Sequence, residues 1–382
     1  MHRDYSMLGP DGARAVETGL AAAQWYHTDV PRKVMKDLMQ RRDGPAIRDS
    51  IILYAAMIVS VGIGIYLWPS WWSAPFWLIY GMLYGSASDS RWHECQHGTA
   101  FKTPWLNEAV YQIACFMIVR NPVTWRWSHA RHHTDTYIVG RDPEIAIMRP
   151  PAFYKVIGNF FGIFDGYVGW SRMVLNATGR LHPEEATYVL AADTTKVVKV
   201  ARIWLAIYAA TIGLALWMGS ILPLMVIGLP RLYGAWHHIM TGLLQHGGLA
   251  DNVTDHRLNA RTVLMNPVSQ FIYWNMNYHV EHHMFPMVPY HALPRLHALI
   301  RHDLPDANPS IPQAFAEMWP ALRRQLANED YYVRRALPGT AKPYREDFHT
   351  AALGTAEQDH PDDTMDRRLC DRRYRPGRSD TL

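Results

Sequence analysis

Histidines dominate the residues of this chain that could carry chemistry. Three of them, His279, His282 and His283, fall within five positions of the stretch 277–286. On a helix these side chains lie one turn apart and can point to one side. Neutral imidazole is a common ligand for iron, zinc and copper. The stretch therefore predicts part of a metal site.

Two further groups of histidines have related spacings. His93 and His97 are four residues apart, so they share one face if they lie on a helix. His129, His132 and His133 repeat the spacing of the stretch described above. These groups extend the predicted metal site to eight residues.

His246, which ends the second hydrophobic block, brings the candidate ligands to nine. A mononuclear zinc site needs only three or four ligands. Nine imidazoles indicate two metal ions with four or five ligands each, and an all-histidine set with open positions suits redox iron that binds O₂.

A net charge of +4 with scattered basic residues gives no sign of nucleic-acid binding. The three separated cysteines suit reduced thiols that face a cytosol.

Two uncharged runs, 51–68 and 71–88, predict a transmembrane helical hairpin. A helix of this length spans roughly 27 Å, close to the hydrocarbon core of about 30 Å. Trp68, Trp71 and Trp72 at the turn are typical of an interfacial aromatic belt. The alternative is a buried hairpin of a soluble protein.

A second apolar block predicts another hairpin, with spans near 202–218 and 221–243. The last span contains Arg231, His237 and His238. An arginine inside a span usually faces protein or a cavity, so Arg231 could meet a substrate carboxylate. The two histidines are expected to be buried or to line a cavity rather than to bind metal.

The expected fold class is an all-α integral membrane protein, with four transmembrane helices in two hairpins and a cytosolic helical cap that holds the metal site. Lys and Arg crowd the ends away from both turns, so the positive-inside rule places the termini and the histidine groups in the cytosol. Residues 109–119 are too short to span and suit a helix in or dipping into the membrane interface, and the aromatic-rich region 150–180 suits helices on the membrane surface. The expected parts are a cytosolic N-terminal segment at 1–44, a membrane domain at 45–300, a helical extension at 301–337 and a disordered tail at 338–382.

The ordered set His93-x-x-x-His97, His129-x-x-His132-His133 and His279-x-x-His282-His283, around two hydrophobic hairpins, resembles the membrane fatty acid desaturase superfamily over roughly residues 45–300. The resemblance implies that these eight histidines bind two iron ions. His246 matches an additional histidine that many members supply after the fourth span. Members use O₂ and two electrons from a reduced carrier to remove hydrogens from an unactivated alkyl chain. The superfamily also contains hydroxylases and other oxygenases, so the resemblance leaves the outcome of the reaction open.

The chain differs from some members of that superfamily. It lacks the His-Pro-Gly-Gly signature of a fused cytochrome b5, so a separate carrier of the ferredoxin or cytochrome b5 type, with its reductase, is expected. Its third motif begins with His279 rather than with the glutamine of the b5-fused subgroup. The turn at 140–144 is similar to that of a bacterial branch, which implies a bacterial inner-membrane location. That branch includes enzymes implicated in rhizobitoxine and rhizopine pathways, so a small amino-acid-like substrate is an alternative to an acyl chain.

Polar residues near the motifs could hold the second nitrogen of a bound imidazole, because that nitrogen usually donates to a carboxylate or carbonyl. The candidates are Glu94, Asp135, Asp142, Glu144, Asn275, Asn277 and Glu281. Ordinary solvated charges are the alternative for each of them. No catalytic residue is predicted beyond the metal ligands. Two other functions stay open: a zinc-dependent membrane hydrolase, which leaves most of the histidines unexplained, and a haem electron-transfer protein, which needs histidines within facing transmembrane helices.

Overall fold

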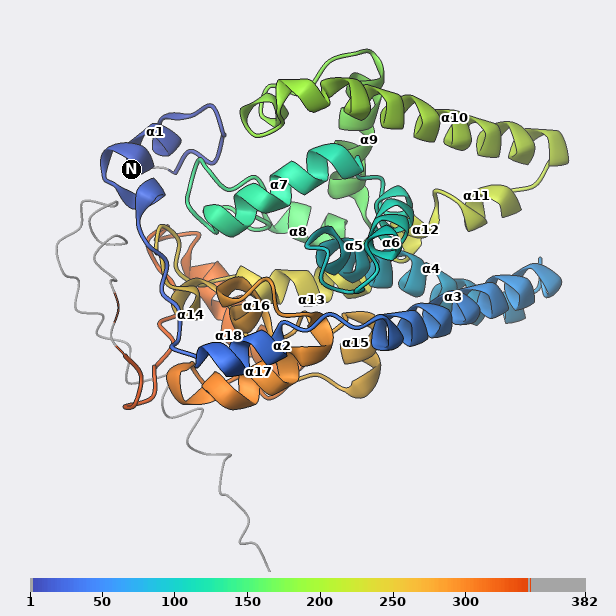
Figure 1. Cartoon of the computed structure of the whole chain (residues 1–382). Coiled ribbons are helices and arrows are strands. Elements are labelled where there is room, and N and C mark those ends of the chain that lie inside the picture. Colours follow the sequence, from blue (N-terminus) through green and yellow to red (C-terminus); the bar gives the residue numbers. More distant parts are fainter. Residues whose placement is uncertain (1–2, 343, 345–382) are drawn as a thin grey trace, which may run out of the picture.

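The computed structural model describes residues 3–342 and 344, and within them it contains helices and two isolated bridges but no strand. The expectation of an all-α fold is confirmed for this part of the chain. Two helical arms project from a cap of shorter helices (Figure 1). The disordered tail predicted at 338–382 lies, from residue 345 on, outside the described residues.

The first arm is the hairpin predicted from the uncharged runs. Its first helix is α3 (Asp43–Tyr66). After a short turn the chain returns as one continuous helical stretch made of α4 (Ala74–Met82), the π-helical segment η3 (Leu83–Ala87) and α5 (Ser88–Gln96). The returning helix continues beyond the apolar run, and α5 carries the first histidine motif into the cap.

The second arm begins with α10 (Thr194–Met218), which ends at Gly219 in the left-handed conformation that favours glycine. The single helix expected at 221–243 is instead three helices. The first break occurs because Gly228 has a φ of 100° and Pro230 has no backbone N–H to continue the preceding helix, and the second break lies at Gly234 and Ala235. They are α11 (Leu222–Val226), α12 (Pro230–Tyr233) and α13 (Trp236–His246).

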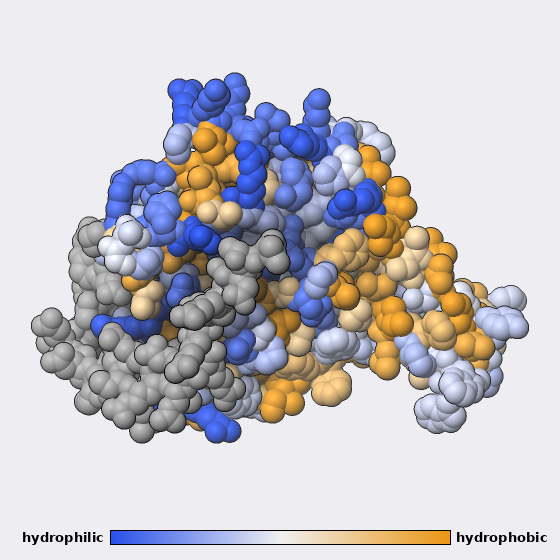
Figure 2. All heavy atoms as spheres, turned by 90° about the horizontal axis from the view of Figure 1, so that it is seen from below, coloured by the Kyte–Doolittle hydropathy of each residue, from blue (hydrophilic) through white to orange (hydrophobic). Residues whose placement is uncertain are grey.

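By length and composition alone, two helical stretches of the described chain, Arg32–Tyr66 and Ala191–Met218, could cross a membrane. Their exposed side chains are strongly apolar, for example Ile58 on the first and Trp217 on the second. Figure 2 shows hydrophobic residues gathered along the part of the molecule that carries the projecting arms, whereas most of the strongly hydrophilic residues in view lie away from the arms. The surface therefore divides as expected for a protein that is partly embedded in lipid.

The cap is built from helices that come from every part of the sequence. Helices lie near both regions, 109–119 and 150–180, that were expected to be helical. The cap helices are α1 (Pro10–Glu17), α2 (Arg32–Leu38), α6 (Pro104–Met117), α7 (Pro122–Thr134), α8 (Phe153–Asn159), α9 (Ile163–Ala177), α14 (His256–Asn259), α15 (Pro267–Ile272), α16 (His279–Met284), α17 (Leu293–Ile300) and α18 (Ile311–Arg324).

A buried network of ion pairs and hydrogen bonds holds the N-terminal segment against the cap. Arg257 pairs with Asp255 at 2.8 Å and with Asp303 at 2.9 Å. The Tyr26 hydroxyl donates to the Asp303 carboxylate at 2.5 Å, and the Arg257 guanidinium lies 3.6 Å from the centre of the Tyr26 ring. Since these side chains are buried, the segment before α2 is held in one position rather than left to fray.

The two arms meet where their backbones touch at glycines. A Cβ atom on Gly234 would lie 1.8 Å from the Gly81 carbonyl oxygen, so no larger residue fits there. One on Gly85 would lie 2.9 Å from the Gly234 carbonyl oxygen. This close approach sets the position of α13 against the helix that carries the first histidine motif.

We expect Gly234→Ala to lower the free energy of unfolding by about 1–3 kcal/mol or more, because the clash is with backbone that cannot rotate away. The matched control is Gly242→Ala in the middle of α13, where nothing lies within 4 Å of the added Cβ. The control should be neutral or stabilising by roughly 0.5–1 kcal/mol, since alanine favours a helix. Thermal unfolding in detergent measures both changes, and equal stabilities would contradict the close contact.

Candidate metal centre

Three short helices each present histidines on one face. His93 lies on α5 and His97 caps its end, four residues later. His129 and His133 have the same spacing on α7, as do His279 and His283 on α16. Because residues four apart are neighbours on a helix surface, each pair points in one direction.

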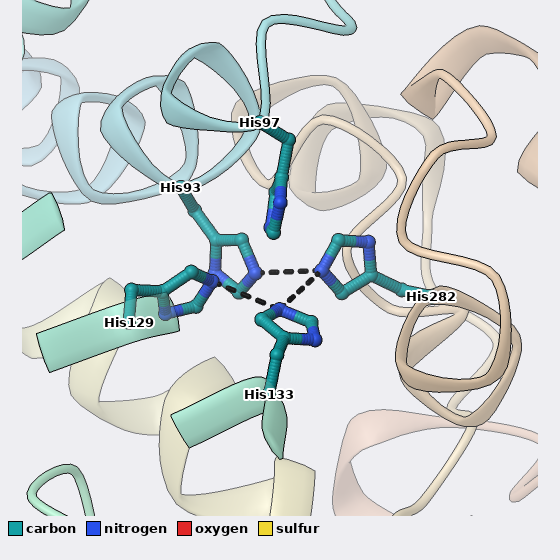
Figure 3. A group of neighbouring side chains, drawn as sticks. All are labelled: His93, His97, His129, His133 and His282. Carbon is teal, nitrogen blue, oxygen red and sulfur yellow. Dashed lines mark hydrogen bonds between the residues drawn. The ribbon is translucent and has the colours of Figure 1, made fainter. Parts of the chain in front are cut away.

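Five of the nine histidines converge on one point (Figure 3). The Nε2 atoms of His93 and His282 lie 2.9 Å apart, and those of His282 and His133 lie 3.2 Å apart. The His129 and His133 Nε2 atoms are 3.0 Å apart. His97 completes this five-histidine group, in which the possible ligand atoms all lie within 4.8 Å of one another.

The remaining four form a second, fully buried group. The Nε2 atoms of His246 and His279 lie 2.9 Å apart, and those of His279 and His283 lie 3.0 Å apart. His132 is the fourth member. Neighbours in sequence, such as His132 and His133, belong to different groups, so the second and third motifs each supply both groups.

The hydrogen bonds of the Nδ1 atoms indicate the protonation state of the Nε2 atoms that face one another. His246 Nδ1 lies 2.7 Å from the Asn259 carbonyl oxygen, which can only accept. The Nδ1 of His132 lies 2.9 Å from Asp142 Oδ2. A neutral imidazole that donates from Nδ1 has its lone pair on Nε2. The lone pairs of these rings therefore point into the four-histidine group.

Burial and the neighbouring imidazoles keep most of these rings neutral. Burial lowers the pKa of His97 to about 4, and it lowers that of His282 well below the usual value. At His132 the Asp142 carboxylate outweighs burial, so the pKa is raised. Burial also raises the pKa of Glu144 to about 7, which a bound cation would oppose by favouring the ionised form. Neutral imidazole is the form that binds metal.

These features fit a pair of metal cations. Several buried Nε2 lone pairs facing one another need a positive partner, and the buried Nε2 of His97 has no hydrogen-bond partner. The all-nitrogen donor set with five and four members suits iron, copper or zinc rather than Mg²⁺ or Ca²⁺. The sequence-based expectation of two metals with four or five ligands each agrees with this arrangement.

A comparison with protein families gives the decisive match. The model of the family described as "Fatty acid desaturase" matches residues 68–315, which include all nine histidines. The chain belongs to the fatty acid desaturase family. The resemblance inferred from the histidine motifs is thereby confirmed.

Curated members of the family are distant relatives. The chain is 23% identical over 271 residues to a chloroplastic omega-3 fatty acid desaturase of Ricinus communis, covering 65% of this chain and 56% of the relative. Two Arabidopsis thaliana relatives are 24% identical over 65% of this chain. One is a temperature-sensitive, ferredoxin-type sn-2 acyl-lipid omega-3 desaturase, of which 60% is covered, and the other a cytochrome b5-type omega-3 desaturase of the endoplasmic reticulum, of which 67% is covered. The chain thus spans little more than half of the length of the first relative.

Two of the predicted carboxylates contact a histidine of the two groups. Asp142 meets His132, as described above, and Glu144 Oε2 lies 2.9 Å from His129 Nδ1. Asp142 also accepts from the backbone N–H groups of Tyr137 and Glu144, so its orientation is fixed.

The other predicted partners turn away from the histidine groups. Asp135 pairs with Arg131 and Arg141, and burial raises its pKa. Asn277 donates to the Val263 carbonyl. The side chain of Asn275 donates to the Tyr290 carbonyl. Closeness to a histidine motif in the sequence therefore did not predict which polar residues contact the histidines.

Two buried glutamates also make their hydrogen bonds outside the two histidine groups. Glu94 accepts from the Thr99 hydroxyl at 2.7 Å, and burial raises its pKa to about 7. Glu281 accepts from the Thr262 hydroxyl at 2.6 Å and contacts His297. Although Glu94 and Glu281 lie inside the first and third motifs, neither contacts a histidine of the two groups in the hydrogen bonds described.

The polar residues expected in the fourth span are buried outside both groups. Arg231 pairs with Asp165, which also pairs with Arg120 at 3.2 Å. The carboxylate that Arg231 meets is thus one of the protein's own. His237 and His238 are buried, as expected, and neither belongs to a histidine group.

Sequence reasoning missed residues that surround the four-histidine group. His256 is buried, and its ring centre lies 4.9 Å from that of His283. Tyr137 stacks on His246 at 4.6 Å, and the Thr136 hydroxyl lies 3.3 Å from His283 Nδ1. The only signal in the sequence was a histidine, His256, in a polar stretch between the fourth span and the third motif.

Proposed function

We propose that this protein is a membrane-bound, O₂-dependent desaturase with two iron ions held by nine histidines. The proposed ligands are His93, His97, His129, His132, His133, His246, His279, His282 and His283. The observation that carries the proposal is the division of their ring nitrogens into adjacent groups of five and four. Membership of the desaturase family supports iron as the metal.

The proposed reaction converts a –CH₂–CH₂– unit, one O₂, two electrons and two protons into –CH=CH– and two H₂O. When bound, the two iron ions would supply the oxidising power that removes hydrogen from an unactivated C–H bond. Asp142 holds the His132 ring so that its Nε2 faces the centre, and the Asn259 carbonyl does the same for His246. Seven of the nine histidines are buried, which keeps bulk water away from the site.

The substrate we propose is a fatty-acyl or other alkyl chain, and the electrons come from a separate carrier. Support comes from the names of the relatives, which are acyl-lipid desaturases that include a ferredoxin type and a cytochrome b5 type. A hydroxylase, or a desaturase of a small amino-acid-like metabolite, shares the same centre and remains the alternative.

We also propose that four segments cross the membrane, with the metal centre in the cytosol at a bacterial inner membrane. The proposed crossing segments are those predicted at 51–68 and 202–218, within or close to α3 and α10, at 71–88, which runs from the turn through α4 to the start of α5, and at 221–243, which runs from α11 into α13. The charge-free turns and the basic residues at the opposite ends support this orientation. Residues 45–300 then form the membrane domain, flanked by a cytosolic N-terminal segment (1–44) and a helical extension (301–337).

Product analysis by mass spectrometry tests the reaction class. Lipids and small metabolites from cells that express the chain should contain a product with two hydrogens fewer than its precursor, formed only in the presence of O₂. A product with one added oxygen would indicate a hydroxylase. Turnover without O₂ would support a zinc-dependent hydrolase and contradict the proposal.

A further inference from the structure

An aromatic stack leads from the N-terminal segment to the four-histidine group. The Trp25 and His256 rings are nearly parallel, 10° apart, with their centres separated by 4.3 Å. The His256 ring in turn lies 4.9 Å from the ring of His283, which belongs to that group. Trp25 is only partly buried, whereas the two histidines are buried. Two successive ring contacts therefore lead from Trp25, which is partly exposed, to His283 in the four-histidine group.

Hydrogen bonds link the same stack to a second member of the group. His256 Nδ1 lies 3.3 Å from the Asn259 side-chain oxygen. The carbonyl of Asn259 is the acceptor for His246 Nδ1. His256 is thus coupled to His283 through space and to His246 through Asn259, although His256 itself belongs to neither histidine group.

The segment that carries Trp25 is held firmly in place. The Trp25 indole N–H donates to the Thr134 carbonyl at the end of α7, at 3.1 Å. The next residue, Tyr26, is anchored to Asp303 in the cap. This segment links α1 to α2 and runs at the end of the molecule away from the tips of α3 and α10 (Figure 1). A soluble partner can reach it while the arms lie in lipid.

Charge around Trp25 favours an acidic partner. Arg131 and Arg141 share one carboxylate, Asp135, at 2.7 and 3.1 Å, which leaves an excess positive charge beside the Thr134 contact. Both guanidinium groups keep some exposure, with side-chain exposures of 31% and 18%. Positively charged residues at the edge of a docking surface increase the rate of association with an acidic partner.

We propose that Trp25 and His256 form the path by which electrons enter the metal centre, and that a small acidic one-electron redox protein docks over Trp25. The inference rests on the proposed function. At each encounter the carrier is oxidised by one electron and the metal pair is reduced by one. Two encounters deliver the two electrons of the desaturation. Trp25 precedes the family match at 68–315, whereas His256 lies within it, so the proposed docking residue lies outside the matched region.

A second series of aromatic contacts reaches the five-histidine group and is the alternative path for electrons. Trp92 packs 5.2 Å from His93, and Trp125 meets Trp92 at 5.2 Å. The Arg120 guanidinium lies 3.6 Å from the centre of the Trp125 ring, and Arg120 also pairs with Asp165 on α9. This path does not lead to the N-terminal segment, so a substitution at Trp125 separates the two possibilities.

The test measures anaerobic oxidation of a reduced carrier by the iron-loaded protein, without substrate, in a stopped-flow instrument. Reduced ferredoxin and reduced cytochrome b5 are used in separate arms, because relatives of both types are known. We expect Trp25→Leu to slow oxidation of the effective carrier by at least about tenfold, as truncation of a tryptophan at the centre of an interface does. Trp25→Phe, which keeps a ring, should retain most of the rate. Reduction by dithionite, which needs no docking, should be unchanged by either variant.

Binding of the oxidised carrier to the metal-free protein gives a readout that is independent of turnover. Trp25→Leu should weaken this binding, and added salt should weaken it in the unsubstituted protein. Trp105→Leu on α6, where the side chain is 68% exposed, is the matched control and should change the carrier rate by less than about twofold.

Three outcomes would overturn the proposed path. They are equal carrier rates for Trp25→Leu and the unsubstituted protein, a parallel loss of the dithionite rate, and a carrier-specific loss in Trp125→Leu instead. If the unsubstituted, iron-loaded protein oxidises neither carrier, the separate-carrier part of the proposed function fails as well. That result is distinct from a failure of the path alone, in which the unsubstituted protein is competent.

Discussion

His282→Ala is expected to lower the iron content from about two ions per chain to about one and to abolish most of the activity. His282 is fully buried, and its Nε2 lies within 3.2 Å of two other members of the five-histidine group. Losing a residue that merely orients a ligand costs about 10–100-fold in metal affinity or activity, so losing a ligand should reduce the rate by at least about 100-fold. Metal analysis after a chelator wash, together with product formation, measures both effects.

The control for this change is His302→Ala. His302 is exposed in the turn η7 (Arg301–Asp303) that follows α17, and it belongs to neither histidine group. Its removal should leave iron content and product formation unchanged. Full iron content and full activity in His282→Ala would rule out the five-histidine group as a metal site. An iron loss in both variants would point to general damage instead.

Asp142→Asn is expected to weaken metal binding by about 10–100-fold, although no ligand is removed. Each carboxylate oxygen of Asp142 accepts from a backbone N–H group, that of Tyr137 or that of Glu144, and both oxygens contact His132 Nδ1. An amide has only one oxygen, so its NH₂ group must face a backbone donor whichever way it is turned. The His132 ring then loses its fixed orientation and the charge that supports its Nδ1 proton.

Asp135→Asn is the matched substitution, a buried carboxylate changed to the same amide seven residues earlier. Asp135 pairs with Arg131 and Arg141 and contacts no histidine of either group in the interactions described. This variant should lose some thermal stability but keep its metal affinity. Competition with a chromophoric chelator measures the affinity, and thermal unfolding measures the stability. Equal metal affinities in the two variants would contradict a positioning role for Asp142.

The local patterns in the sequence were sufficient to predict the helices that carry the histidines. Spacing of three and four residues places side chains on one helix face whatever the surroundings, because it follows from helix geometry. The uncharged run at 51–68 likewise predicted a long apolar helix from local sequence alone, and α3 includes most of this run. The all-α class and the convergence of nine histidines followed from these patterns and from the charge distribution.

The second apolar block shows where local patterns stop. Hydropathy predicted one helix at 221–243, but the chain breaks at Gly228 and before Pro230, and Gly234 contacts Gly81 on the other arm. A break of this kind depends on what packs against it, which hydropathy does not contain.

The sequence by itself determined the chemistry of this protein: nine imidazoles, their helical pairs and a family of metal-dependent desaturases. Only the tertiary structure decided how the histidines divide into two groups. His132 and His133 are adjacent in sequence, yet they serve different groups because successive residues on a helix point about 100° apart and the partners come from other helices. It also decided that Asp142 contacts His132 while Asp135 pairs with arginines, and that Trp25 and His256, 231 positions apart, stack beside the four-histidine group. Contacts between distant segments depend on the packing of the whole cap, and no short stretch of sequence records that packing.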